Sequence, residues 1–192
     1  MTIFLAALLP FAGAALVALA ARLGRSPAAW TAGAVTAASL ALLAPLFPLA
    51  SAGETLIQQH DWVPSLGLDL AFRLDGLAML FAGLILGIGL LIVLYARYYL
   101  SERDSMGRFY AYLMLFMGSM LGIVLSENLI QLLVFWELTS LSSFLLISYW
   151  QHREEARQGA RMALAVPGMG GFGLLAGVLL LGHIVGSYNL SD

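Results

Sequence analysis

Apolar residues occur along this chain in runs long enough to cross a lipid bilayer, and short polar breaks separate these runs. A helix that spans the hydrocarbon needs about 20 mostly apolar residues. Six runs meet this requirement, so we predict spanning helices over residues 2–21, 28–50, 76–99, 109–125, 129–150 and 160–185. The pattern predicts an all-α polytopic membrane protein that forms a single membrane domain over residues 1–192.

The segment between the second and third runs has a different period. From residue 66 to residue 74 a leucine or phenylalanine occurs at every second position, which is the period of a β-strand. Residues 55–62 can pair with this segment around a turn at 64–67, so we predict a small external β-hairpin over about 55–74. Asp75 precedes Gly76 at a helix start, where its carboxylate is more plausible as a cap of free amides than as a group that takes up ions.

Composition identifies lipid as the solvent of most of the surface. Hydrophobic residues make up 61% of the chain and charged residues only 10%, whereas a soluble domain has roughly a quarter of its residues charged. The net charge of −2 offers no basic face to nucleic acid. Because the chain has neither cysteine nor lysine, it can form no disulfide, zinc-thiolate site, cysteine nucleophile or Schiff base.

The arginines indicate how the helices cross the membrane. Eight of the nine basic residues fall in or beside the first, third and fifth loops, and Arg73 alone lies on the other side. Cytoplasmic loops carry an excess of positive residues. We therefore predict a multi-pass protein of the cell membrane with both termini outside.

Glu137 is the residue that most strongly suggests a function. It lies near the middle of the fifth run, about 13 Å from the helix start beside Asn128 at 1.5 Å per residue. An ionised carboxylate at this depth costs at least ~2.5 kcal/mol unless it is paired, protonated or hydrated. We interpret Glu137 as a proton- or cation-relay carboxylate in preference to a polar anchor between helices.

Three other residues are candidates for the same pathway. Ser140 lies one turn beyond Glu137, in a band of hydroxyl side chains that can hold water or bond other helices. His183, near the end of the last run, titrates in the physiological range, although an interfacial histidine is the more common explanation. Arg161, at the start of that run, is a weak candidate for an inward-facing cation.

Glycines predict helix packing and not a cofactor site. Three glycine pairs have the four-residue spacing that lets helices approach closely in lipid: Gly83 and Gly87, Gly118 and Gly122, Gly173 and Gly177. Residues 168–173 also match G-x-G-x-x-G. No strand precedes this match and no βαβ unit surrounds it, so we predict no dinucleotide site. We predict no cofactor and no metal.

Three stretches of sequence resemble a known family. They are RLDGL beginning at Arg73, FYAYLMLFMGSMLG beginning at Phe109, and above all FWELTSLSSFLLI beginning at Phe135. They are similar to the amino-terminal part of the A subunit of Mrp-type multisubunit Na⁺/H⁺ antiporters, which is related to the antiporter-like membrane subunits of complex I. The resemblance covers essentially the whole chain.

The resemblance implies a role and a partner for Glu137. It matches the family's essential carboxylate on the fifth helix, which is thought to pair with a lysine on a later helix, and no such helix is present here. Relatives often carry a lysine near the position of Met162, where this chain has Arg161 as the nearest cation. Because arginine holds its proton firmly, Arg161 can bias Glu137 but not relay a proton. We therefore expect a fragment or a split gene product that assembles with the remainder, or a truncated relic, and in each case a chain that is inactive alone.

Three functions remain open at this point. The first is a component of a multisubunit Na⁺/H⁺ antiporter that moves protons and Na⁺ together with other subunits. The second is an antiporter-like membrane subunit of a proton-pumping NADH-quinone oxidoreductase or membrane hydrogenase, in which redox chemistry would lie elsewhere. The third is a membrane scaffold that transports nothing. In each case the chain itself is not expected to be an enzyme.

Overall fold

The computed structural model describes residues 1–63 and 68–191, and for residues 61–63, 68 and 69 it describes the backbone alone. The elements are α1 (Thr2–Ala20), η1 (Ala21–Leu23), α2 (Arg25–Leu43), η2 (Ala44–Leu46), α3 (Phe47–Ser51), β1 (Leu56–Val63), β2 (Leu68–Leu74), α4 (Gly76–Tyr99), α5 (Met106–Leu125), α6 (Leu129–Ile147) and α7 (Glu154–Val185). Six helical stretches in the described part are long and apolar enough to cross a membrane. The predicted all-α membrane fold with six spans is confirmed.

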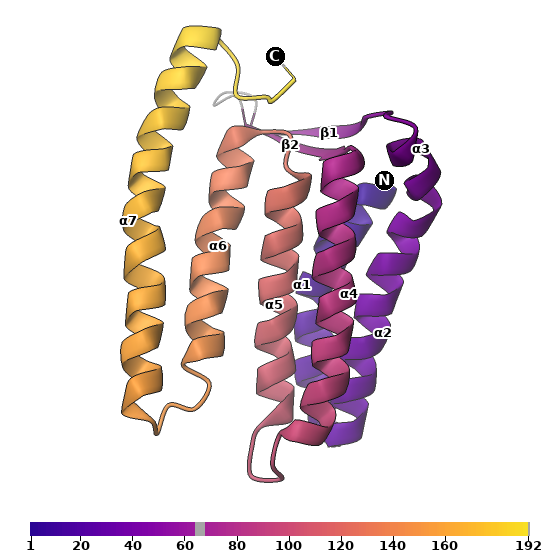
Figure 1. The fold of residues 1–192 in the computed structure, drawn as a ribbon, viewed down its shortest axis with the longest axis vertical. Coiled ribbons are helices and arrows are strands. Elements are labelled where there is room, and N and C mark those ends of the chain that lie inside the picture. The colour runs from indigo at the N-terminus through magenta and orange to yellow at the C-terminus, as the bar shows by residue number, and fades with distance from the viewer. Residues whose placement is uncertain (64–67, 192) are drawn as a thin grey trace.

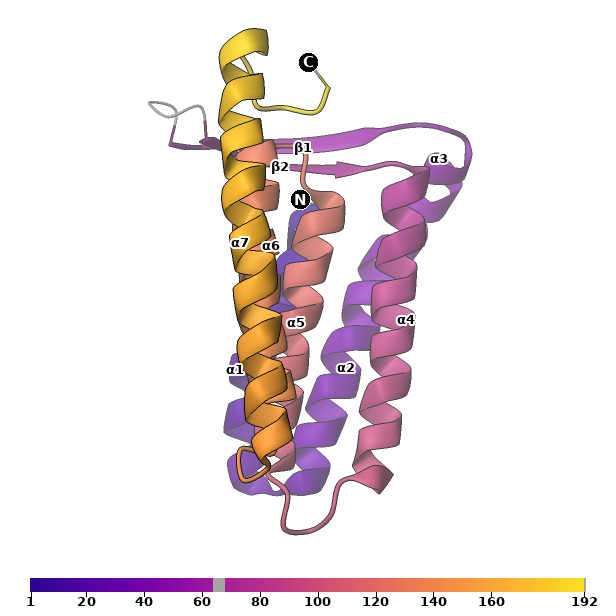
Figure 2. The same cartoon turned by 60° about the vertical axis from the view of Figure 1, so that its left-hand side comes forward.

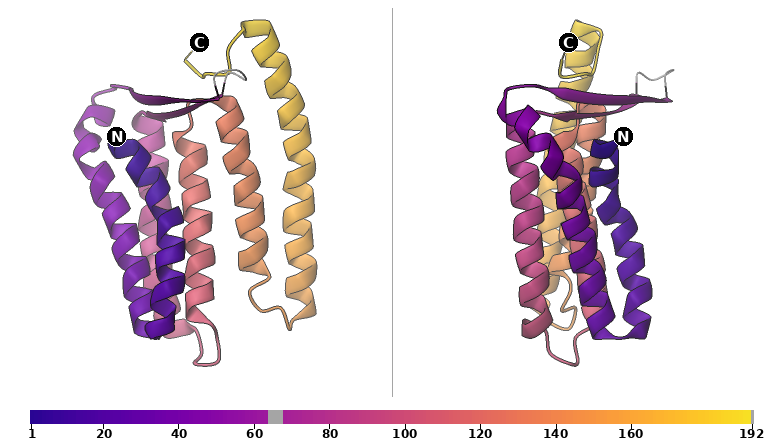
Figure 3. Two further views of the ribbon diagram at one scale, coloured as in Figure 1. Left: turned by 180° about the vertical axis from the view of Figure 1, so that it is seen from behind. Right: turned by 90° about the vertical axis from the view of Figure 1, so that its right-hand side faces the viewer.

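The helices form two groups (Figure 1). Helices α1, α2, α4 and α5 form a four-helix bundle, α6 packs along α5, and α7 packs along α6. Figure 3 shows the same order from behind, with α7 projecting beyond the rest of the bundle. Both termini lie at one end, as six crossings require, and the hairpin lies across that end (Figure 2). We call this the hairpin end and the opposite end the loop end.

The hairpin has the predicted strands. Leu56 pairs with Leu74 and His60 with Leu70 in antiparallel register. Phe72 and Leu74, which point toward the helices, are fully buried beneath the sheet. The predicted turn at 64–67 lies outside the described residues. Asp75 ends the hairpin as predicted, because its Oδ1 accepts the Ala78 backbone N–H at 2.8 Å and caps α4.

Several helix ends differ from the predicted bounds: α2 begins at Arg25 and α5 at Met106, each three residues earlier than predicted, and α6 ends at Ile147, three residues earlier than predicted. Two further differences have clear physical reasons. The second span ends as η2 and α3 because Pro45 and Pro48 lack the backbone N–H that an uninterrupted α-helix needs. The last helix begins at Glu154, six residues before the apolar run, because Glu154 and Glu155 interact favourably with the free amides of its first turn. Pro167 lies inside α7, and the helix continues through it.

Glycines divide the helices into closely packed and open faces. A Cβ on Gly118 would lie 2.8 Å from the Phe11 ring, and one on Gly122 would overlap the Phe135 ring. By contrast, nothing lies within 4 Å of a Cβ built on Gly83, Gly87, Gly173 or Gly177. The close packing predicted from glycine spacing therefore holds within this chain for the pair on α5 alone.

Candidate ion-translocation site

Glu137 lies at the middle of α6 and faces α7. Its carboxylate occupies the space beside Gly171, so that a Cβ on Gly171 would collide with Oε1. Gly171 is buried, whereas the neighbouring Gly168, Gly170 and Gly173 leave open space around them. A glycine at position 171 is thus what allows the carboxylate to lie against the backbone of α7.

The surroundings of Glu137 are apolar and open. Glu137 itself is exposed along the surface of this chain. Trp136, Leu138 and Leu141 on α6 are exposed large hydrophobic residues, as are Met169 and Phe172 on α7. In the part of the chain that the structure describes, no arginine or histidine comes within 4.0 Å of the Glu137 carboxylate. A carboxylate at membrane depth normally faces a bundle interior or a water-filled cavity, and this chain alone supplies only one wall of such a site.

The other predicted site residues are not gathered around Glu137. Arg161 and His183 are both exposed on α7. Arg161 lies ten residues before Gly171 and His183 twelve residues after it, which places them about 15 Å and about 18 Å away along the helix axis, in opposite directions. Neither can contact Glu137 directly in this arrangement.

Ser140 is close to Glu137 in sequence but faces away from the open side. It is only 5% exposed, and its hydroxyl donates to the Trp136 backbone carbonyl at 3.3 Å. Thr139 and Ser142 likewise donate to carbonyls of their own helix. The predicted band of hydroxyl side chains is present, but these hydroxyl groups donate their hydrogen bonds to backbone carbonyls of α6 itself.

A buried acid that the sequence analysis did not single out lies at the hairpin end. Glu127 is 2% exposed, and its Oε2 lies 3.7 Å from Arg73 Nη1. Its backbone N–H donates to Ala71 of β2 at 2.9 Å, and its Oε1 accepts the Ser191 N–H at 2.8 Å. The sequence held only a partial signal for this pair, because Arg73 is the lone arginine predicted on its side of the membrane and Asp75, whose Oδ2 lies 3.3 Å from Arg73 Nε, is already a partner close in sequence.

We call residues 126–128 the junction, because they join three segments of the chain. Ser126 pairs with Phe72 of β2, and Asn128 pairs with Asn189 beyond α7. Asn128 also caps α6, since its Oδ1 accepts the Ile130 and Gln131 amides. Gly186, with a φ of +83°, ends α7 and turns the chain back toward the junction. The junction therefore sets the register of α7 against α6 at one end, and with it the position of Gly171 opposite Glu137.

Two sequence families match parts of the chain. The family described as "NADH-Ubiquinone oxidoreductase (complex I), chain 5 N-terminus" matches residues 62–110. The family described as "NADH:quinone oxidoreductase/Mrp antiporter, TM" matches residues 126–192, which include the junction, Glu137 and Gly171.

Curated relatives are components of antiporters. A probable K⁺/H⁺ antiporter A/B subunit of Rhizobium meliloti (strain 1021) is 50% identical over 95% of this chain and 18% of its own length. The A subunit of a Na⁺/H⁺ antiporter of Alkalihalophilus pseudofirmus is 50% identical over 74% of this chain and 18% of its own length. The chain therefore spans about a fifth of the length of these relatives.

Solved structures agree in fold. A chain of the Mrp complex from Dietzia sp. DQ12-45-1b superposes over 100% of this chain and 20% of its own length, with a TM-score of 0.89 and 33% identity. A chain of the membrane-bound sulfane sulfur reductase, an archaeal respiratory membrane complex, has a TM-score of 0.80 at 19% identity, which shows the shared fold alone. The chain belongs to the family of antiporter-like membrane subunits and corresponds to the amino-terminal part of the A subunit of Mrp-type antiporters.

Proposed function

We propose that this chain is the amino-terminal, ion-translocating part of a multisubunit monovalent cation/proton antiporter. The observation that carries the proposal is the placement of Glu137 at mid-span, against Gly171, with no cation of the described chain beside it. Such a carboxylate can bind and release a proton as its surroundings change, which a carboxylate held in a permanent ion pair does poorly.

The open face of α6 and α7 is covered by protein in the working assembly. An exposed carboxylate among exposed apolar side chains is unstable against lipid. Further helices, from a longer subunit or from separate subunits, complete the site and supply the basic partner that this chain lacks. Alone, the chain moves no ions.

The hairpin end faces the outside of the cell in this proposal. Eight of the nine arginines then lie at or near the cytoplasmic surface. Arg73, the exception, is held by Glu127 and Asp75 at the hairpin end. The coupling ion is monovalent, and we propose Na⁺; the named relatives are divided between Na⁺/H⁺ and K⁺/H⁺ antiporters.

Substitution of Glu137 tests the proposal. The complete complex containing Glu137→Gln is assayed in inverted membrane vesicles for proton movement driven by Na⁺ and, separately, by K⁺. We expect exchange to be lost with both ions, because glutamine has the shape of the side chain but cannot take up a proton. Glu154→Gln, which removes a charge from the exposed first turn of α7, is the matched control and should retain exchange. Full exchange by a correctly assembled Glu137→Gln complex would overturn the proposal.

A redox-driven pump is the second candidate, because one matching family is described as part of complex I. The same carboxylate would then move protons in response to electron transfer in other subunits. The vesicle assay distinguishes the two functions: an antiporter moves protons when a cation gradient is applied with no electron donor, whereas a redox pump requires the donor.

A further inference from the structure

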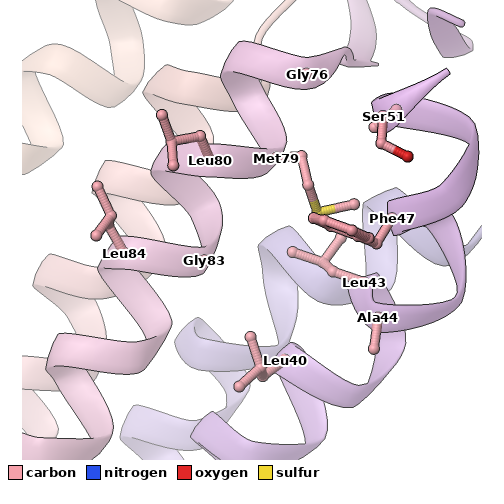
Figure 4. A pocket seen from close by; sticks show the side chains of 11 residues that line it. Leu40, Leu43, Ala44, Phe47, Ser51, Gly76, Met79, Leu80, Gly83 and Leu84 are labelled. Atoms are coloured by element: carbon pink, nitrogen blue, oxygen red, sulfur yellow. The ribbon is translucent and has the colours of Figure 1, made fainter. Parts of the chain in front are cut away.

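Two separate widenings between α2 and α4, one toward each end of the molecule, differ in charge, and we call the one at the loop end the groove. The widening at the hairpin end has a volume of about 750 Å³ and runs from Leu40 to Ser51 on one side and from Gly76 to Leu84 on the other. Figure 4 shows it lined by leucines, Phe47 and Met79, with the Ser51 hydroxyl as the polar side-chain group at its rim. No charged side chain lines it, so an apolar chain of any lipid can fill it without selection.

The widening at the loop end has a cation at its mouth. It has a volume of about 320 Å³, with Ala29 and Gly33 of α2 and three leucines and Val93 of α4 as its apolar walls. Trp30, Arg97 and Tyr98 complete the lining. Trp30 is 72% exposed and Tyr98 79% exposed. Aromatic residues of this kind occupy the headgroup level of a bilayer, which places the mouth of the groove at the membrane surface and its apolar walls in the hydrocarbon.

Arg97 is held in position but not neutralised. Its Nη2 donates to Ser26 Oγ at 2.9 Å, and its guanidinium carbon lies 5.6 Å from the centre of the Trp30 ring. No carboxylate of the described residues lies within 4.0 Å of it. A guanidinium has five N–H donors in a planar fork, so most of its donors remain for a ligand.

The acids in the neighbouring loop do not serve as that ligand. Asp104 is engaged elsewhere, since its carboxylate accepts hydrogen bonds from Ser101 and from the Trp150 indole. Glu102 is exposed and forms no ion pair with the described arginines. Arg25, at the start of α2, adds a second positive charge here while its donors bind the carbonyls of Leu100, Ser101 and Asp104. The mouth of the groove is therefore electropositive.

We infer that this groove binds one phospholipid with an anionic headgroup, whose phosphate contacts Arg97 and whose acyl chain lies between α2 and α4. Planar guanidinium groups bind phosphate oxygens in pairs, and basic pockets between membrane helices select anionic lipid headgroups. The apolar walls supply a place for the chain, and the positive charges of Arg97 and Arg25 favour a headgroup with net negative charge over one that also carries its own ammonium group. The inference is independent of Glu137 and of the transport function.

Native mass spectrometry of the detergent-purified complex tests the inference, with phosphatidylglycerol and phosphatidylcholine as probes. We expect the complex to retain one phosphatidylglycerol in preference to phosphatidylcholine. Arg97→Gln should weaken phosphatidylglycerol binding by about fivefold, the effect of removing one basic residue at a membrane surface. Arg22→Gln removes an exposed arginine at the same end that does not line the groove, and it should have no effect.

A second pair of variants separates the groove from the charge. Gly33→Leu fills the groove while Arg97 remains, and it should also displace the lipid. Gly83→Leu fills the uncharged widening and should leave phosphatidylglycerol binding unchanged. Equal retention of both lipids, or unchanged binding in Arg97→Gln and Gly33→Leu, would overturn the inference and leave Arg97 as a cation that merely extends to the membrane surface. A cross-link from residue 33 to a partner protein would overturn it too, because a protein helix would then occupy the groove.

Discussion

The four-helix bundle and the α6/α7 pair consist of similarly apolar residues but are buried to different degrees. In the most apolar stretches of the four bundle spans 28–50% of residues are buried, with α5 the highest, against 22% in α6 and 11% in α7. In the bundle, side chains of one helix pack against glycines of the next: the Phe11 ring packs against Gly118, and the Val35 methyl groups pack against Gly13. The α6/α7 pair is covered by the bundle on one side only, and Glu137 lies exposed on its uncovered side.

Under the proposed function, this difference separates the residues that stabilise the fold from the residues that carry out transport. A carboxylate that must change its protonation needs surroundings that can rearrange or hydrate, which a tightly packed core does not provide. A rigid bundle beside an incomplete pair provides both a support and a face that other helices can complete. Substitutions in the bundle should therefore impair folding, and substitutions in the pair should impair transport.

The largest effect is expected where α6 joins the bundle. In Gly122→Leu the new side chain would overlap the ring of Phe135, which also packs against Phe11 and Phe72 at ring-centre distances of 6.2 and 6.1 Å. Overpacking of this kind costs about 1–3 kcal/mol, or more where backbones must separate. Thermal unfolding of this chain, purified by itself in detergent, should show the loss, whereas Gly173→Leu, on the face of α7 that is open in this chain, should unfold as wild type does. Equal tolerance of both substitutions would remove the distinction between bundle and pair.

A smaller change in the pair should affect transport without affecting folding. In Gly171→Ala the added methyl group collides with Glu137 Oε1 and must displace the carboxylate. We expect exchange to fall by roughly tenfold or more, since a shift of about 1 Å in a reacting group has effects of this size. Gly159→Ala adds the same methyl group to α7 at an ordinary contact distance of 3.6 Å from Ile147 and should transport normally. Alanine is favoured over glycine within a helix by about 0.5–1 kcal/mol, and thermal unfolding of both variants should show that the loss of exchange in Gly171→Ala does not arise from unfolding.

Loss of the Glu127 contacts at the junction should destabilise the end of α7, with an effect of intermediate size. Glu127→Ala removes one of the two acidic partners of Arg73 and the acceptor of the Ser191 N–H, which should cost about 1–3 kcal/mol. Glu127→Gln retains the acceptor and loses only the charge, so its effect should be smaller. Hydrogen exchange should increase in the last turn of α7 and at Leu190 and Ser191 while the bundle stays protected. Glu54→Gln, an exposed acid at the same end, is the control; faster exchange in the bundle than in α7 would contradict this role.

The sequence predicted the features that depend on local chemistry. Helix positions followed from apolar length, the hairpin from the alternation that ends at Leu74, and the cap from Asp75. Such features depend on residues within one or two turns of each other. The same pattern missed the start of α7, because Glu154 and Glu155 stabilise a helix that extends beyond its apolar run.

Contacts between residues far apart in the sequence could not be predicted from the spacing of apolar and polar residues. Glu137 was recognisable as a carboxylate at membrane depth, but nothing in the spacing of residues indicated that Gly171 would lie opposite it. The match to G-x-G-x-x-G drew attention to the whole stretch 168–173, whereas only the packing of α6 against α7 distinguishes Gly171 from its neighbours. Likewise the pairing of Glu127 with Arg73 depends on the hairpin folding over the end of α5.

The smallest predicted effect is a pH dependence at the loop end, where the two groups of helices meet again. Hydrogen bonds from the Trp150 indole and the Ser101 hydroxyl hold the pKa of the Asp104 carboxyl below its usual value of 3.8. Because the folded form binds this proton less readily than the unfolded form, ionised Asp104 stabilises the fold at neutral pH, and the contribution is lost as the pH falls through the lowered pKa. Unfolding temperatures measured between about pH 7 and about pH 3 should therefore decline slightly less steeply in Asp104→Asn than in wild type. Glu102→Gln removes a neighbouring exposed acid, and its unfolding temperature should fall with pH as steeply as that of wild type. A shallower fall in Glu102→Gln as well would mean that the pH dependence reflects the overall charge of the loop and not the contact between Asp104 and Trp150 that joins the bundle to the pair.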